Sequence, residues 1–274
     1  MERVTEADLP DVTRFLEARM DRAMFPLNNL RSFGLDGEAA LAPRLWAARE
    51  AGNVTGVFCQ LTNKTVMPIC APELTCAILK GRALLHLIGP TDLVRPVIET
   101  LELSRVPHML NRDEPHMTLS LSKLHVPEGS GALKPLSAAD PATILAWREA
   151  DLIEALGYPP DKARKESAEF YAAHAKSDRY RVLMDGDTPL SITGFNAVLP
   201  EIVQIGGVYT PPQLRNRGHA RRAVALHLAQ ARAQGVRQAT LFSNGPAAQR
   251  AYEAIGFTKV GGWTLFLRSE AGYV

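Results

Sequence analysis

The chain has 274 residues, of which 46% are hydrophobic, and 31 basic residues against 29 acidic ones give it a net charge of +2. This length suits one large domain or two ordinary ones, and the balanced charge indicates neither a nucleic-acid partner nor an anionic membrane surface. Cys59, Cys70 and Cys76 lack the spacing of a metal or redox site, so we expect reduced core thiols in a cytoplasmic protein. The first residues are too charged for a signal peptide, and no window is apolar enough to span a membrane.

The first residues of the chain resemble a segment near its middle. Residues 4–18 read VTEADLPDVTRFLEA and residues 135–150 read PLSAADPATILAWREA. Each runs from a polar stretch with an aspartate (Asp8, Asp140) through a proline into an amphipathic segment. This order predicts a strand end, a helix N-cap and a helix in both places.

A second pair of similar segments suggests that the chain is built from two similar halves. Residues 117–126, MTLSLSKLHV, and residues 263–270, WTLFLRSE, both have the pattern of a late strand, and the stretch VPEGSGALKP at 126–135 has the composition of a linker. We therefore predict two α/β domains of similar design, at residues 1–128 and 133–274. Two unrelated domains with similar ends are the alternative.

The second half reads as alternating helices and strands. A Gly206-Gly207 pair interrupts the strand predicted at 201–210, and paired glycines in a strand indicate a bulge or a close approach to the backbone. The other predicted elements are helices at 141–157, 161–176, 218–234 and 246–256, and strands at 180–186, 189–199 and 238–243.

Residues 210–222, TPPQLRNRGHARR, place basic side chains around one glycine where a helix begins. The first N–H groups of a helix lack intrahelical partners, the helix dipole is positive there, and Gly218 leaves the backbone open to a ligand. With Arg215 and Arg217 added, the segment predicts a cradle for a pyrophosphate. A solvated basic turn is the alternative. A Walker loop and a dinucleotide-binding turn are excluded, because the segment lacks GK[ST] and GxGxxG.

The segment RNRGHA at 215–220 resembles the Q/R-x-x-G-x-G/A signature of the GNAT acetyltransferase superfamily, and PAAQRAYEAIGF at 246–257 resembles a helix and strand start common there. The resemblance covers about residues 135–274. It implies an α/β (α+β) fold of two tandem GNAT-like domains, each a mixed, mostly antiparallel sheet flanked by helices. The equivalent stretch of the first half, VMPICAPELTCAILKG at 66–81, has no arginine, so we expect a degenerate domain without a cofactor loop there.

The resemblance also implies which residues bind acetyl-CoA. Its pantetheine arm would pair with the strand that holds the bulge, and its pyrophosphate would lie on the main chain of the basic loop and the first turn of the helix. The implied cofactor-binding residues are Val208, Tyr209, Thr210, Arg215, Asn216, Arg217, Gly218, His219, Ala220 and Asn244. Asn244 departs from the family pattern, because eight residues rather than the usual seven separate it from Tyr252.

The implied reaction is direct transfer of the acetyl group to a primary amine of a small molecule or peptide. Tyr252 would give a proton to the leaving thiolate, and Glu201 would act through water as the base. A core tyrosine and a solvated glutamate are the alternatives for these two residues. Asp151 and Glu154 could favour a cationic amine or simply solvate their helix. We expect no metal, nucleic acid or membrane to bind, and leave a homodimer open. A non-catalytic acyl-CoA-binding or sensor protein is the competing function.

Overall fold

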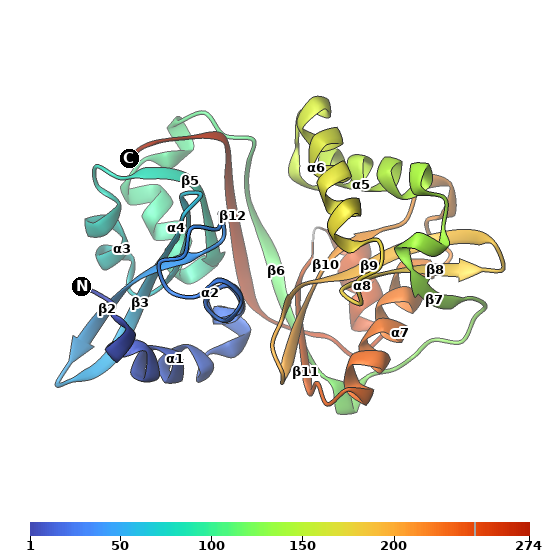
Figure 1. The fold of residues 1–274 in the computed structure, drawn as a ribbon, viewed down its shortest axis with the longest axis horizontal. Coiled ribbons are helices and arrows are strands. Elements are labelled where there is room, and N and C mark those ends of the chain that lie inside the picture. The colour runs from blue at the N-terminus through green and yellow to red at the C-terminus, as the bar shows by residue number, and fades with distance from the viewer. Residues whose placement is uncertain (244) are drawn as a thin grey trace. The chain divides into compact units, whose positions relative to one another are not determined.

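A computed structural model describes residues 1–243 and 245–274 of the chain. The chain forms two compact units (Figure 1). The first unit contains Met1–Glu114 together with Gly261–Val274, and the second contains Pro115–Val260. Among the described residues, no helix is both long and apolar enough to cross a bilayer.

The first unit is a mixed sheet with four α-helices. Its strands follow the order β1-β2-β3-β4-β5-β12, in which only β4 and β5 run parallel and the other neighbours are antiparallel. Its strands are β1 (Glu2–Arg3), β2 (Pro43–Glu50), β3 (Asn53–Leu61), β4 (Thr65–Ile69), β5 (Ala83–Pro90) and, from residue 261 on, β12 (Thr258–Tyr273). Its helices are α1 (Leu9–Glu17), α2 (Met20–Phe33), α3 (Pro72–Leu79) and α4 (Thr91–Thr100).

The second unit repeats this plan. Its strands follow the order β6-β11-β10-β9-β8-β7, and again only one neighbouring pair, β10 with β11, is parallel. Its strands are β6 (Leu110–Ser120) from residue 115 on, β7 (Ala132–Pro135), β8 (Tyr180–Asp185), β9 (Thr188–Val198), β10 (Ile202–Tyr209) and β11 (Gln238–Phe242). Its helices are α5 (Pro141–Leu156), α6 (Pro160–His174), α7 (His219–Ala233) and α8 (Pro246–Glu253).

Read from β7 to β6, the strand order of the second unit matches that of the first unit from β1 to β12, element by element. This match confirms the predicted tandem α/β architecture. The units differ from the predicted division at residues 128 and 133 in where their last strands belong. Residues 116–120 of β6 pair with β11 in the second unit, and residues 261–273 of β12 belong to the first unit, where β12 pairs with β5. An alternating pattern marks a segment as a strand with one buried face but does not name its partner strand.

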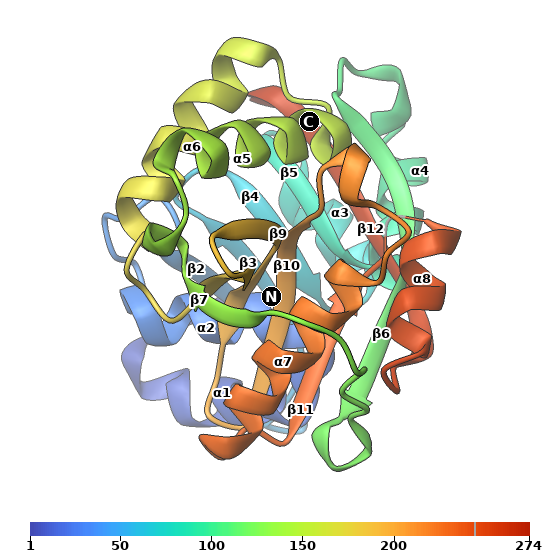
Figure 2. The ribbon, with the colours of Figure 1, turned by 90° about the vertical axis from the view of Figure 1, so that its right-hand side faces the viewer.

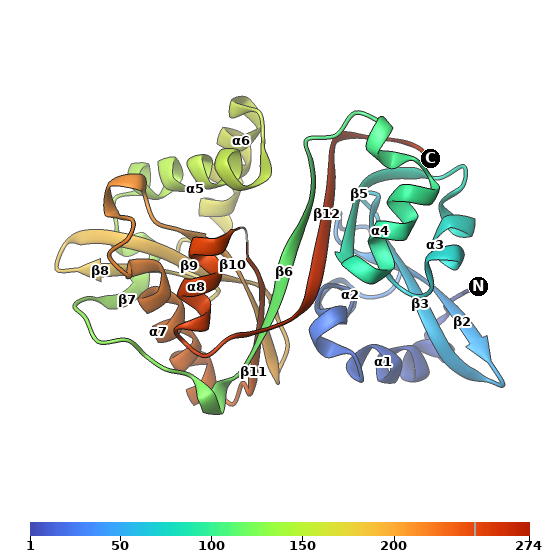
Figure 3. The same ribbon diagram turned by 180° about the vertical axis from the view of Figure 1, so that it is seen from behind.

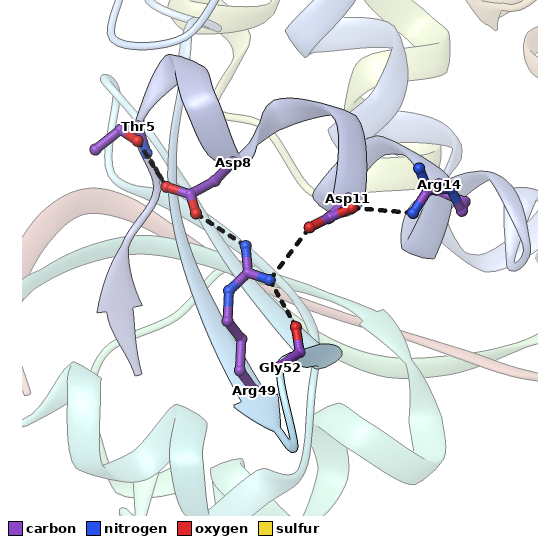
Figure 4. A network of polar contacts seen from close by, with 6 residues as sticks. All are labelled: Thr5, Asp8, Asp11, Arg14, Arg49 and Gly52. Carbon is purple, nitrogen blue, oxygen red and sulfur yellow. Dashed lines mark hydrogen bonds and ion pairs between the residues drawn. The ribbon is translucent and has the colours of Figure 1, made fainter.

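A network of polar contacts secures the first helix of the first unit (Figure 4). The Asp8 carboxylate accepts hydrogen bonds from the main chain and side chain of Thr5 at 2.9 and 2.7 Å. These hydrogen bonds lower the pKa of Asp8. Arg49, at the end of β2, binds Asp8 at 2.8 Å, Asp11 at 3.4 Å and the Gly52 carbonyl at 3.0 Å. The start of α1 is thereby tied to the β2–β3 hairpin.

The matching helix of the second unit begins more simply. Asp140 is the N-cap of α5 and accepts a hydrogen bond from the Thr143 amide at 3.1 Å, with Pro141 in the first helical position. Gly157 ends this helix in the left-handed conformation, with φ of 68°. The predicted helix boundaries are therefore confirmed at this position.

Helix α7 lies over one face of the sheet of the second unit (Figure 2), and the core that supports the candidate site lies between them. Helix α7 packs on β9 and β10, and α8 lies beside α7 (Figure 3). One face of α7 is buried against the sheet, whereas Ala220 in its first turn is only partly covered. The buried members of the core include Ala223, Val224, Leu228 and Ala231 from α7 and Val203, Ile205, Leu241 and Met117 from the strands.

Candidate active site

The strand β10 carries the predicted bulge. Its antiparallel register with β9 passes from Gly206 opposite Gly194 to Tyr209 opposite Ile192, so β10 has one residue more than β9 in this interval. Val208 falls inside this irregularity. The parallel pairing of β10 with β11 covers only Ile202–Ile205 on β10. The last residues of β10 therefore run past the end of that ladder.

Glycines are required at the bulge because side chains from β8 and β9 fill the space above it. A Cβ atom on Gly206 would lie 1.8 Å from Asn196 Nδ2, and one on Gly194 would lie 2.1 Å from the Tyr180 ring. Gly207 has φ of 60°, and a Cβ there would lie 3.0 Å from Tyr180 Cε1. The Gly206-Gly207 pair thus serves both a left-handed backbone and a close approach by neighbouring side chains.

A cleft of about 790 Å³ opens beside the bulge, entirely within the second unit. Four segments line it: one face of α5, the end of β10, the loop into the first turn of α7, and α8 with the residue before it. The lining residues are Asp151, Glu154, Ala155, Val208, Tyr209, Thr210, Leu214, Arg215, Asn216, Arg217, Gly218, His219, Ala220, Arg221, Gly245, Pro246, Ala247, Ala248, Arg250, Ala251 and Tyr252.

The structure brings nearly all predicted site residues to this one cleft. Those lining it are Val208, Tyr209, Thr210, Arg215, Asn216, Arg217, Gly218, His219, Ala220 and Tyr252. Asn244, the remaining predicted cofactor contact, lies outside the described residues.

The prediction that Glu201 acts as the base needs correction, because Glu201 does not line the cleft. The residue is exposed at the start of β10, where its carbonyl accepts hydrogen bonds from the amides of Arg237 and Gln238 at 2.9 Å. A strand rises about 3.3 Å per residue, so six residues place Glu201 roughly 20 Å from Gly207. Membership of the same strand does not bring it near the bulge.

The loop before α7 has the backbone of an anion-binding turn. Asn216 and Gly218 both have left-handed φ angles, of 63° and 82°. Gly218 is the N-cap of α7, whose helical residues begin at His219. The N–H groups of the first helical turn have no intrahelical acceptors, and they lie in a part of the chain that lines the cleft.

Positive charge is concentrated around this loop. Arg217, Arg221 and Arg250 line the cleft, and within residues 1–243 and 245–274 none of the three forms an ion pair. Arg215 binds Glu154 of α5 at 2.6 Å. The cleft therefore offers three uncompensated guanidinium groups next to a helix N-terminus, which suits a polyanion.

The last arginine of the basic run has a structural role instead. Arg222 is absent from the cleft lining, and its guanidinium donates to the carbonyls of Ser130 at 2.9 Å, of Gly131 at 3.4 Å and of Pro127. Gly129 lies against the same side chain. Arg222 thus holds the linker before β7 onto α7.

Tyr252 reaches the cleft from α8. Its ring is half-buried and packs on the core between α7 and the sheet, as Val208 does. The Phe257 ring meets it at 6.0 Å between centroids in an edge-on arrangement. The hydroxyl-bearing residue and the bulge are therefore anchored to the same core and face the same cleft.

A polar cluster lies beside the bulge, and of its residues only Asp151 was named from the sequence, as one that could favour a cationic amine or simply solvate its helix. Arg148 Nη1 donates to Asp151 Oδ2 at 2.5 Å, and Tyr180 donates its hydroxyl proton to Asn196 Oδ1 at 2.7 Å. Arg148 Nη1 also lies 3.4 Å from where a Cβ on Gly207 would be. The i,i+3 spacing of Arg148 and Asp151 was the only available signal, and that spacing is common on solvated helices.

The first unit has no counterpart to the basic loop. Only Cys70 and Ala71 connect β4 to α3, whereas residues 210–218 connect β10 to α7. Pro72 occupies the first position of α3 and supplies no N–H group.

Comparison with known proteins agrees with this geometry. Residues 144–257 match the family model described as the acetyltransferase (GNAT) family. No curated protein sequence matches the chain.

Solved structures share the fold over nearly the whole chain. An acetyltransferase from the GNAT family of Colwellia psychrerythraea has a TM-score of 0.52 at 15% identity, covering 97% of this chain and 99% of its own. A GCN5-related N-acetyltransferase from Sphaerobacter thermophilus has a TM-score of 0.59 at 14% identity, with coverages of 97% and 93%. A tandem GNAT protein from the clavulanic acid biosynthesis pathway has a TM-score of 0.50 at 12% identity, with coverages of 99% and 97%.

The matched residues contain the bulged strand, the basic loop and Tyr252, and the strand order of each unit agrees with a tandem arrangement of one fold. The second unit is a domain of the GNAT acetyltransferase family, within a chain that has the tandem GNAT fold.

Proposed function

We propose that the second unit transfers the acetyl group of acetyl-CoA to a primary amine of a small molecule or peptide. The observation that carries this proposal is the convergence on one cleft of the β10 bulge, the basic loop and Tyr252. Acetyl-CoA enters as a substrate and supplies the thioester. The chain's part is to hold it, orient it and move protons.

The residues of the cleft suit the charge and length of acetyl-CoA. The N–H groups from Arg217 to Ala220 and the nearby guanidinium groups bind the pyrophosphate. The main chain of Val208 and Thr210, past the end of the β10–β11 ladder, binds the pantetheine arm as an added strand would bind. The Val208 amide at the bulge donates to the oxygen that becomes negatively charged as the amine attacks.

Tyr252 is the proposed acid. As the C–N bond forms and the C–S bond breaks, the sulfur becomes a thiolate and takes a proton from the tyrosine hydroxyl. Tyr252 is suited to this role because the core holds its ring in place and the residue lines the cleft.

Two measurements test the proposal in sequence. Calorimetry with acetyl-CoA is expected to give one site per chain, since only the second unit has the basic loop. A thiol-release assay over a panel of primary amines is then expected to find an acceptor. Two equivalent sites would contradict the asymmetry of the units. Binding without turnover of any amine would favour a non-catalytic acyl-CoA-binding or sensor protein.

A further inference from the structure

The cleft holds one mostly covered carboxylate that has no assigned role in cofactor binding. Asp151 of α5 lines the cleft, and only 14% of its side chain is exposed. Its partner Arg148 is also mostly covered, with 20% of its side chain exposed. Even a paired charge loses its hydration when it is covered in this way, so the position of this carboxylate invites a functional explanation.

We propose that Asp151 is the base that takes the proton from the acceptor amine, with Arg148 as the residue that positions its carboxylate. This inference rests on the proposed function. It replaces Glu201, which lies outside the cleft.

The side chain of Arg148 connects Asp151 to the bulge of β10. Arg148 Nη1 is 2.5 Å from Asp151 Oδ2 and 3.4 Å from the Cβ position of Gly207 in the bulge. A guanidinium is planar and rigid, so it fixes the carboxylate beside the bulge. Val208 and Asp151 line the same cleft, which places the base and the proposed oxyanion donor around one space.

The surroundings of Asp151 make it a better base than an exposed aspartate. Burial raises the pKa of Asp151, Arg148 opposes this, and the charge of Glu154 adds to it. From β8, the Tyr180 hydroxyl faces the same pair, and burial raises the pKa of Tyr180 so that it stays neutral. A carboxylate whose pKa is shifted toward neutrality accepts a proton more readily at physiological pH.

Glu154 is the other acidic residue of the lining, and it is less suitable. Nearly half of its side chain is exposed, at 46%, and Arg215 occupies one of its oxygens at 2.6 Å. Its other oxygen lies 3.4 Å from the Tyr209 hydroxyl. Glu154 is therefore engaged with the cofactor loop, whereas Asp151 is held toward the bulge.

The proton balance is complete without a further reactant. The ammonium form of the acceptor gives one proton to Asp151, and the neutral amine attacks the thioester carbonyl. The C–N bond forms, the C–S bond breaks, and the thiolate takes the proton of Tyr252. After the attack the nitrogen still carries two protons, and it gives one of them, directly or through water, to the Tyr252 phenolate, which restores the hydroxyl. After the product leaves, the Asp151 proton passes to water.

The test compares amines that do and do not need a base. Asp151→Asn keeps the size of the side chain and removes its basicity. We expect kcat/KM for aliphatic primary amines, which are charged at pH 7, to fall about 10²–10⁴-fold, the usual range for a lost general base. For aniline, which is neutral at pH 7, we expect a loss below about tenfold. Acetyl-CoA affinity measured by calorimetry should stay within about twofold.

Two further variants control for folding and for loss of the ion pair. Asp161→Asn removes an exposed aspartate that also lies three residues from an arginine, and it should change nothing. Asp151→Glu restores a carboxylate and should recover part of the aliphatic-amine rate. The acidic limb of the kcat/KM profile should be present in the parent and in Asp151→Glu and absent in Asp151→Asn.

The outcomes separate this inference from the proposed function. Equal losses for aliphatic amines and aniline, or unchanged rates for both, would overturn the role of Asp151 while leaving acetyl transfer intact. A parent chain that does not bind acetyl-CoA, or binds it and acetylates no amine, would overturn the proposed function and this inference with it.

Discussion

Arg215 and Glu154 form an ion pair that joins the cofactor loop to α5. Arg215 Nη2 lies 2.6 Å from Glu154 Oε2, while Arg215 Nε donates to the Thr210 carbonyl at 2.9 Å. Both residues line the cleft. In this arrangement the guanidinium assigned to the pyrophosphate is occupied by a carboxylate. An incoming phosphate must compete with Glu154 for it.

Glu154→Gln is therefore expected to strengthen acetyl-CoA binding. Both side chains are about half exposed, and such ion pairs are worth about 0.2–1 kcal/mol. Removing the carboxylate should lower Kd by roughly 1.5–5-fold, with less effect at high salt. Calorimetry at two salt concentrations measures this. Glu149→Gln, on the same helix but outside the cleft lining, is the control. Weaker binding by the Glu154 variant would show that this carboxylate supports the cofactor site.

Gly218→Ala should impair cofactor binding beyond its effect on stability. Gly218 has φ of 82°, and an added Cβ would lie 3.1 Å from Arg221 Nε, in the cleft. Gly235 has φ of 100° with open space around it, so Gly235→Ala is a matched control for backbone strain. Each variant should lose about 1 kcal/mol of unfolding free energy. Only Gly218→Ala should lose acetyl-CoA affinity, by about tenfold or more. Equal affinities in both variants would remove the loop from the cofactor site.

Tyr252→Phe should slow the chemistry and spare the fold. The change removes one oxygen and keeps the ring that packs on the core of α7 and the sheet. Single-turnover rates should fall about 10²–10⁴-fold, with acetyl-CoA affinity nearly unchanged. Tyr171→Phe, a partly buried tyrosine outside the cleft lining, is the control. A lower melting temperature with an unchanged rate would make Tyr252 a structural residue.

His227 should make the second unit less stable in mild acid. Its ring stacks on Phe195 at 3.8 Å between centroids, and Nε2 contacts the Asp178 carbonyl at 3.2 Å. Burial lowers the pKa of His227 from 6.5 to about 4. Between these values the unfolded chain binds a proton that the folded chain does not. Stability from this group is therefore complete above pH 6.5 and falls by up to about 1.4 kcal/mol per unit as the pH drops toward 4.

Urea denaturation of His227→Gln at several pH values checks this. The variant keeps a hydrogen-bond donor but has no charge to gain, so its unfolding free energy should vary less between pH 7 and pH 4.5. His125→Gln, at an exposed position, should keep the pH dependence of the parent. Parallel curves for the parent and His227→Gln would mean that His227 is not the source of the acid sensitivity.

Much of the candidate site could be predicted from the sequence because its parts are local. Gly206-Gly207 marks a bulge within one strand, and Gly218 marks a left-handed residue directly before α7. The conformations of such segments depend on a few neighbouring residues. The first N–H groups of a helix lack intrahelical acceptors regardless of where the helix packs. The basic loop, the helix after it and Tyr252 on α8 were found in this way.

The tertiary structure alone decided which groups from distant segments meet. Arg148 and Tyr180 converge on the bulge because α5 and β8 pack there, and Glu201 is excluded because its strand extends away from the cleft. The closing strands β6 and β12 pair with β11 and β5, although alternation alone suggested that each would complete its own half. A periodic pattern encodes which face of a segment is buried. Its partner is chosen by the register and packing of the whole sheet.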